Sequence, residues 1–139
     1  MAIDVSTYFV SINAVDLSAK CISVGSLDQA REEQDITAFG DPIRQMQGTI
    51  EGSPDLTLTF NQDFAAALVH ATINPIYTGK TAVAIDLRPS NAARSATNPS
   101  FTFTAKIPRY TVMENATPGG TLKASCTLRR TTAVVVATS

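Results

Sequence analysis

The segment Leu56-Thr57-Leu58-Thr59-Phe60 alternates apolar and polar side chains without a break. Successive side chains of a β-strand point to opposite faces, so the leucines and Phe60 share one face and the threonines share the other. One face of this strand is therefore expected to be buried and the other to be polar.

Further segments on both sides of it have strand-like patterns rich in β-branched and aromatic residues. They are residues 8–15, 21–27, 81–88, 101–107 and 122–129. The strand that begins at Phe101 is expected to continue through Val112 past Pro108. Val134 to Val136 form a short apolar tail.

Residues 64–77 are rich in alanine and predict the single helix of the chain. Phe64 and Leu68 are spaced as on one helical face, and Asp63 is placed to cap the N-terminus. Pro75 is expected to end the helix, because the residue before a proline avoids the α conformation.

The predicted fold is mainly β: an antiparallel β-sandwich or part-closed barrel with one short flanking α-helix and a long hairpin. The hairpin is placed at the polar segment 28–35, which is expected to form its charged tip and shoulder. A length of 139 residues fits one domain spanning residues 1–139, with a core of about 8–128 and a short C-terminal arm.

Composition excludes several classes of partner. Hydrophobic residues make up 44% of the chain and charged residues 17%, with a formal net charge of −1. No block of Lys or Arg predicts nucleic-acid binding, and no apolar run predicts a membrane span or a signal peptide. The mean hydropathy of +0.06 is high for such a protein, which is explained if other copies cover part of the surface.

Catalytic and metal signatures are absent from the sequence. His70 is the only histidine and is expected at a surface or boundary position. Cys21 and Cys126 lack zinc-ligand spacing and are expected to be free thiols, although a disulfide between them stays open. The sequence therefore predicts a protein that is not an enzyme and has no cofactor or metal.

Four segments, in this order, carry a resemblance to a known family. They are Thr37-Ala38-Phe39-Gly40-Asp41, Phe60-Asn61-Gln62-Asp63-Phe64, Arg88-Pro89 and Ser95-Ala96-Thr97-Asn98-Pro99. Over about Val10 to Leu128, the chain resembles the tail tube (major tail) proteins of long, non-contractile-tailed bacteriophages.

This resemblance implies a structural virion protein that is assembled in the host cytoplasm. Its copies would form rings, typically of six, that stack into a tube through which DNA passes without specific binding. The other partners would be tape-measure, terminator and baseplate proteins, with no membrane.

Other interpretations stay open. A tail terminator, a head–tail connector and a capsid-decorating protein use similar folds. A monomeric module that binds carbohydrate or peptide is less favoured, because the chain has no Trp and only three Tyr. A hydrolase would lack its catalytic residues.

Two sets of residues are candidates for assembly. The first set is polar and is expected in the lumen or at the ring-to-ring contact: Arg31, Glu32, Glu33, Asp35, Arg44, Glu51 and Asp55. An acidic wall would let DNA slide, whereas a Lys/Arg wall would bind phosphate through counterion release. Glu32 and Glu33 are expected to repel DNA or to meet Arg31 or Arg44 of a neighbouring ring, and an exposed hairpin without such a role is the alternative.

The second set is apolar and is expected to be buried between subunits: Leu27, Ile36, Phe39, Ile43 and Met46. A domain of this size is not expected to cover all five side chains. Polar substitution at Phe39 or Ile43 should then give soluble monomers, whereas aggregation or unfolding would place these residues in the core of the domain.

Overall fold

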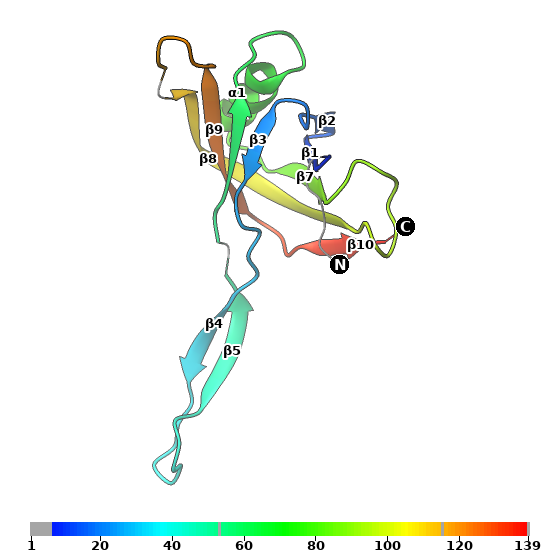
Figure 1. The fold of residues 1–139 in the computed structure, drawn as a ribbon. Helices are drawn as coiled ribbons and strands as arrows, with labels where there is room; N and C mark the ends of the chain where they lie inside the picture. The colour runs from blue at the N-terminus through cyan, green and yellow to red at the C-terminus, as the bar shows by residue number, and fades with distance from the viewer. Residues whose placement is uncertain (1–6, 53, 115, 139) are drawn as a thin grey trace.

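A computed structural model describes residues 7–52, 54–114 and 116–138. Within these residues the chain forms ten strands and one helix (Figure 1). In chain order they are β1 (Phe9–Ile12), β2 (Val15–Asp16), β3 (Cys21–Val24), β4 (Arg31–Asp35), β5 (Met46–Glu51), β6 (Leu56–Asn61), α1 (Val69–Gly79), β7 (Val83–Arg88), β8 (Ser100–Glu114), β9 (Lys123–Arg130) and β10 (Val135–Ala137).

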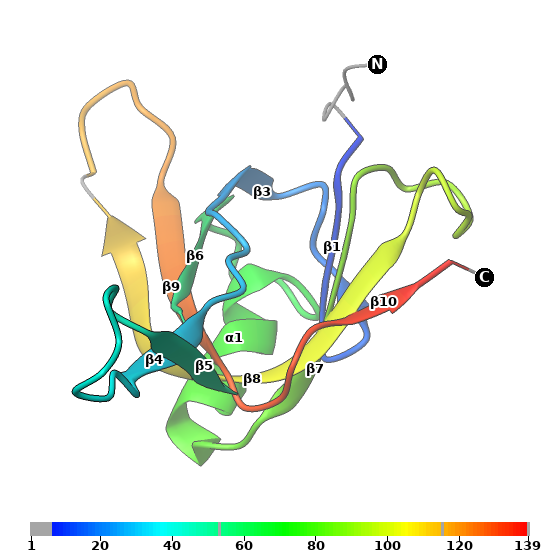
Figure 2. The ribbon, with the colours of Figure 1, turned by 90° about the horizontal axis from the view of Figure 1, so that it is seen from below.

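Eight of these strands form one antiparallel sheet, which confirms the predicted fold class. The strand order is β2-β1-β7-β8-β9-β6-β3, and β10 pairs with β8. The sheet curves around α1 (Figure 2), and β2 and β3 remain at its two ends, so the barrel is only partly closed. Strands β4 and β5 form a separate two-stranded sheet.

The alternating segment at 56–60 forms β6, and its leucines and Phe60 are buried as expected. Each of these side chains lies opposite a buried residue of β9, so one face of the strand pair builds the core. The paired residues are Leu56 and Leu128, Leu58 and Cys126, and Phe60 and Ala124.

The helix differs from the prediction at both ends. Helix α1 begins at Val69, and it continues through Pro75 to Gly79. Val69, Ile73 and Ile76 follow one another at helical spacing and are all buried. Burial of Ile76 beyond the proline therefore offsets the backbone hydrogen bond that Pro75 cannot make.

The N-terminal part of the expected helix is instead a loop. Ala67 has a φ of 60°, a left-handed conformation that interrupts any helix running from Phe64 to Val69. Asp63 is not the cap: its carboxylate accepts a hydrogen bond from the Ala65 N–H at 2.9 Å, within this loop.

Strand β8 does continue past Pro108, as expected, and its register shifts between Lys106 and Arg109. A proline is tolerated there because a bulge needs no ladder hydrogen bond from it. The apolar C-terminal tail forms β10, which pairs with Ser100 to Thr102 of β8. Among the described residues, no helix is long and apolar enough to cross a membrane.

Candidate interaction site on the β4–β5 hairpin

The hairpin of residues 28–51 projects from the rest of the protein, which we call the body (Figure 1). Among the described residues its two strands pair only with each other, and at its base the Gly52 N–H donates to the Ala30 carbonyl at 2.7 Å, which holds the two arms together. All of residues 28–50 are exposed. A two-stranded ribbon is at best marginally stable in water, so a ribbon of this kind is expected to gain contacts from a partner.

The charged segment 31–35 forms a strand of this hairpin, so the prediction of a hairpin is right and the predicted position of its tip is wrong. The tip, residues 36–45, contains the turn signal Gly40-Asp41-Pro42. The turn residues decide where the chain reverses, and the charged residues lie along the arm below them.

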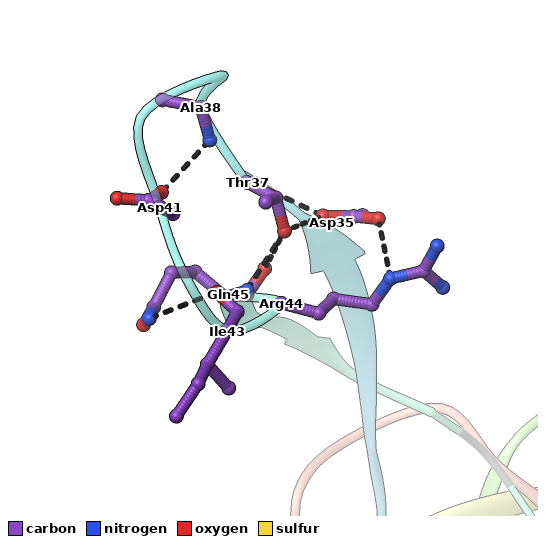
Figure 3. Close-up of polar contacts among 7 residues, drawn as sticks. All are labelled: Asp35, Thr37, Ala38, Asp41, Ile43, Arg44 and Gln45. Atoms are coloured by element: carbon purple, nitrogen blue, oxygen red, sulfur yellow. Dashed lines mark hydrogen bonds and ion pairs between the residues drawn. The ribbon is translucent and has the colours of Figure 1, made fainter.

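Side-chain hydrogen bonds hold the base of the tip (Figure 3). The Asp35 carboxylate accepts the Thr37 N–H at 2.9 Å and the Thr37 hydroxyl at 2.5 Å. The same hydroxyl oxygen accepts the Gln45 N–H from the opposite side at 2.7 Å. Arg44 lies 3.4 Å from Asp35, so one carboxylate ties both sides of the loop together.

The apex is closed by Asp41. Its carboxylate accepts the Ala38 N–H at 2.8 Å, and its own N–H donates to the Ala38 carbonyl at 3.0 Å (Figure 3). The tip therefore has a defined shape before any partner binds. A preorganised loop loses less conformational entropy on binding than a flexible one.

The bonds from Thr37 also stabilise the charge of the tip. The Thr37 hydroxyl and then its N–H stabilise the carboxylate form and lower the pKa of Asp35. Asp35 is ionised at neutral pH, as an ordinary carboxyl group is, so its hydrogen bonds to Thr37 are charge-assisted.

Large apolar side chains are presented on this polar frame. Phe39 at the apex is 114% exposed relative to its reference value, and Ile43 is 72% exposed. Ile36 and Met46 are also exposed, as is Ile50, which the sequence interpretation did not include. Ile50 could have been found from its position four residues after Met46, on the same face of the strand.

The remaining apolar candidate, Leu27, lies elsewhere. It is partly buried against the core of the body, so it is not part of the exposed group. It lies at the root of the hairpin, where the chain leaves the body. The four other predicted apolar residues belong to the hairpin.

The polar candidates are only partly brought together. Glu32 and Glu33 are exposed on β4, while Arg31 donates to the Thr49 carbonyl at 3.2 Å across the hairpin. Arg44, as described, pairs with Asp35, so both arginines have partners within their own hairpin.

The other two polar candidates are Asp55 and Glu51. Asp55 lies in the body and forms a bidentate ion pair with Arg129 of β9, at 3.0 and 3.1 Å. Glu51 ends β5, and its side chain lies outside the described residues.

The only histidine has a structural role in the body. Gln62 is oriented by accepting the Asp63 N–H at 3.0 Å and donating to the Val112 carbonyl at 2.6 Å. Its amide also donates to the Tyr110 hydroxyl at 3.0 Å, and His70 Nδ1 is hydrogen-bonded to the same hydroxyl at 3.0 Å. This chain of bonds fastens α1 to β8.

Both cysteines are free thiols. Burial raises the pKa of the Cys21 thiol to about 11 and that of Cys126 to about 12, so both are protonated at neutral pH. Among the described residues, no group of three or more His, Cys, Asp and Glu side chains is arranged to hold a metal ion.

Comparison with known proteins found similarity at the level of structure. No protein-family model matches the sequence, and no curated protein sequence matches it. A chain from the sheath/tube terminator of an extracellular contractile injection system, PVC, in its extended state superposes with a TM-score of 0.76. The two chains are 16% identical, over 98% of this chain and 96% of that one.

Two other solved structures are similar. A chain from the cap of the anti-feeding prophage, described as its tube terminating cap, has a TM-score of 0.76 and 14% identity, over 100% of this chain and 93% of that one. A chain from the PVC sheath–tube complex in the extended state has a TM-score of 0.72 and 14% identity, over 99% and 93%.

At these identities the comparisons show a shared fold. The same fold occurs in chains of an extracellular contractile injection system, PVC, and of the anti-feeding prophage. PVC is described as contractile, whereas the sequence resemblance pointed to long non-contractile tails. Two of the three structures are described as a terminator or cap, and the third as a sheath–tube complex.

Proposed function

We propose that this chain is a structural protein of a phage-tail-like particle and that its copies form a ring that terminates the tube. The β4–β5 hairpin is the observation that carries this proposal. The fold shared with a tube terminator and a tube terminating cap supports the terminal position of the ring. Other proteins of the tail would be its partners.

The energetics of the hairpin favour association. Burying one large apolar side chain contributes about 1.5–3 kcal/mol, and association costs an estimated 4–15 kcal/mol in lost motion. One residue cannot offset that cost. Several can, and five lie exposed on one hairpin: Ile36, Phe39, Ile43, Met46 and Ile50.

A second candidate is the tube subunit itself, whose rings, of six copies in the family it resembles, would stack. The shared fold with a chain of a sheath–tube complex favours it, and so does the acidity of the hairpin. Residues 28–51 contain six carboxylates and two arginines. Carboxylates such as Glu32 and Glu33 on a lumen wall would repel passing DNA.

Charge reversal tests this lumen role. The substitutions Glu32→Lys and Glu33→Lys should leave thermal unfolding unchanged, because both side chains are exposed. Within the tube proposal, particles carrying them should eject DNA poorly. Normal ejection by such particles would exclude the lumen role.

Electron microscopy of the purified protein at low and high concentration separates the two candidates. Single rings that do not stack at any concentration would support the terminator. Stacked rings or tubes would support the tube subunit and would give the ring symmetry directly. A monomer at every concentration would contradict self-assembly and with it both proposals.

A further inference from the structure

We infer that the hairpin tip of one copy inserts into a cavity on the body of the next copy, a cavity with an apolar floor and a rim of lysines. This inference rests on the ring-forming function proposed above and names the surface that receives the hairpin. We call this surface the basic cavity. We call the exposed Lys80 and Lys106 its rim and the apolar Ile107 and Pro108 its floor, and Arg129, Arg130 and Thr131 complete the lining.

The basic cavity lies where three elements of the body meet. Lys80 is the left-handed C-cap of α1, Pro108 lies at the register shift of β8, and Arg129 of β9 is paired with Lys106. The cavity has a volume of about 330 Å³ and is lined mainly by carbon atoms. Sites of about 300–1,000 Å³ accept drug-sized molecules, so a single phenyl ring fits.

Two cations at the rim are available to a partner. Lys80 and Lys106 are exposed, and neither has an ion-pair partner among the described residues. Arg129 contributes less, because Asp55 already neutralises it at 3.0 Å. An acidic group that docked at this rim would therefore meet two uncompensated positive charges.

The hairpin has the complementary character. It holds six of the chain's 12 carboxylates but only two of its 11 basic residues, which leaves the rest of the chain with nine basic residues and six carboxylates. At the tip, the fully exposed Phe39 lies in sequence between Asp35, which Arg44 partly neutralises, and Asp41, which has no ion-pair partner among the described residues. An apolar group flanked by carboxylates thus matches an apolar floor flanked by lysines.

Two other hollows of the body match the hairpin less well. The cavity beside β1 and β3, lined by Tyr8, Cys21 and Val24 among others, has no Lys or Arg in its wall. The groove across β6, β8 and β9 contains both Arg109 and Glu114 and is mostly polar. Neither combines an apolar floor with positive charge alone.

The hairpin that enters the cavity belongs to another copy. The tip is exposed and points away from its own body (Figure 1), so it reaches no cavity of its own chain. Nine steps of about 3.3 Å from Arg31 to Gly40 give the arm a reach of roughly 30 Å. Because the two surfaces of this contact differ, it is head-to-tail and can close into a ring.

Mixing two defective variants tests this contact. The cavity variant carries Lys80→Glu and Lys106→Glu and keeps an intact hairpin. The tip variant carries Phe39→Ser and keeps an intact basic cavity. At a concentration that lies between the dissociation constants of the intact and the weakened contacts, we expect each variant alone to be monomeric in sedimentation velocity, and an equimolar mixture to form a one-to-one dimer. The mixture should not grow further, since the unused hairpin and the unused cavity of that dimer are both defective.

A matched control changes charge elsewhere on the body. The variant with Arg94→Glu and Lys123→Glu alters the formal charge by the same amount, although it also removes the Arg94–Asp86 ion pair of 3.9 Å, and it should assemble as the unmodified protein does. Equal thermal unfolding of all variants would show that they are folded. Two results would overturn the proposed contact without affecting the ring-forming function. In the first, the cavity variant assembles like the unmodified protein. In the second, the mixture stays monomeric while the unmodified protein forms rings. Failure of the unmodified protein to form rings would instead count against the proposed function.

A crosslinking experiment tests the same contact without a variant that is defective in assembly. A photoreactive phenylalanine analogue at position 39 should crosslink, in the assembled protein, to peptides that contain Lys80, Lys106 to Pro108, or Arg129. Mass spectrometry of mixed isotopically labelled and unlabelled copies would show that the link joins different chains. A crosslink that maps to another part of the body would place the tip elsewhere and overturn the inference.

Discussion

Replacing Phe39 by serine should weaken the association between copies without changing the stability of the fold. Phe39 lies at the apex of the hairpin and is fully exposed, so the body loses no packing when the phenyl group is removed. We therefore expect the free energy of unfolding to change by no more than about 0.5 kcal/mol, as for other surface substitutions. The phenyl group of Phe39 should be buried in each contact between copies, where its loss weakens the free energy of association by about 1.5–3 kcal/mol. Since 1.4 kcal/mol is a factor of about ten, the dissociation constant should rise by about tenfold to 150-fold.

Two measurements on the same samples check this. Denaturant unfolding gives the stability of the fold, and sedimentation velocity over a concentration series gives the association constant. Phe60→Ala is the matched control, because Phe60 is fully buried and its truncation should cost about 3–5 kcal/mol of stability. If Phe39→Ser destabilises the fold like the control, or leaves association unchanged, the reasoning about the exposed tip is refuted.

Three further predictions concern local chemistry. Because Thr37 lowers the pKa of Asp35, the Asp35 carboxylate stabilises the tip at neutral pH and loses this effect as the pH falls below the usual value of 3.8. The protection of the residue 37 amide, which compares its exchange rate with the intrinsic rate at the same pH, should then decrease, and constant protection would contradict this. Tyr110→Phe removes the hydrogen bonds that fasten α1 to β8 and should cost about 0.5–1.5 kcal/mol in denaturant unfolding, whereas an unchanged midpoint would show that these bonds are not needed. Cys21, whose pKa burial raises to about 11, should react with iodoacetamide at pH 8 on the order of 100-fold more slowly than an ordinary thiol, and fast labelling would show that its site opens.

Local alternation was enough to predict most of the sheet. The strands β6 and β8 follow from residues that alternate over five or more positions, and β8 tolerates Pro108 because a register shift lies there. The order of the strands in the sheet was not predictable in this way, since it depends on contacts between residues far apart in the chain.

The helix and the hairpin tip show where such reasoning fails. Pro75 was expected to end α1, but burial of Ile76 after it outweighs the local preference. The left-handed conformation of Ala67, which shortens the helix at its start, has no signal in an alanine-rich sequence. The charged segment 28–35 was predicted to form the tip, whereas the chain reverses at the turn residues after it, because charge indicates exposure without indicating whether a residue lies in a strand or a turn.

Deleting the hairpin tests most directly whether it is the element of assembly. Ala30 and Gly52 are already joined by a 2.7 Å hydrogen bond, so a short turn can replace residues 31–51 without distorting the body. None of the described side chains of this segment belongs to the core, so the shortened protein should unfold at nearly the same temperature as the full chain. By sedimentation and electron microscopy it should be monomeric. Rings formed by the shortened protein would contradict the account, because assembly would then use another surface of the body.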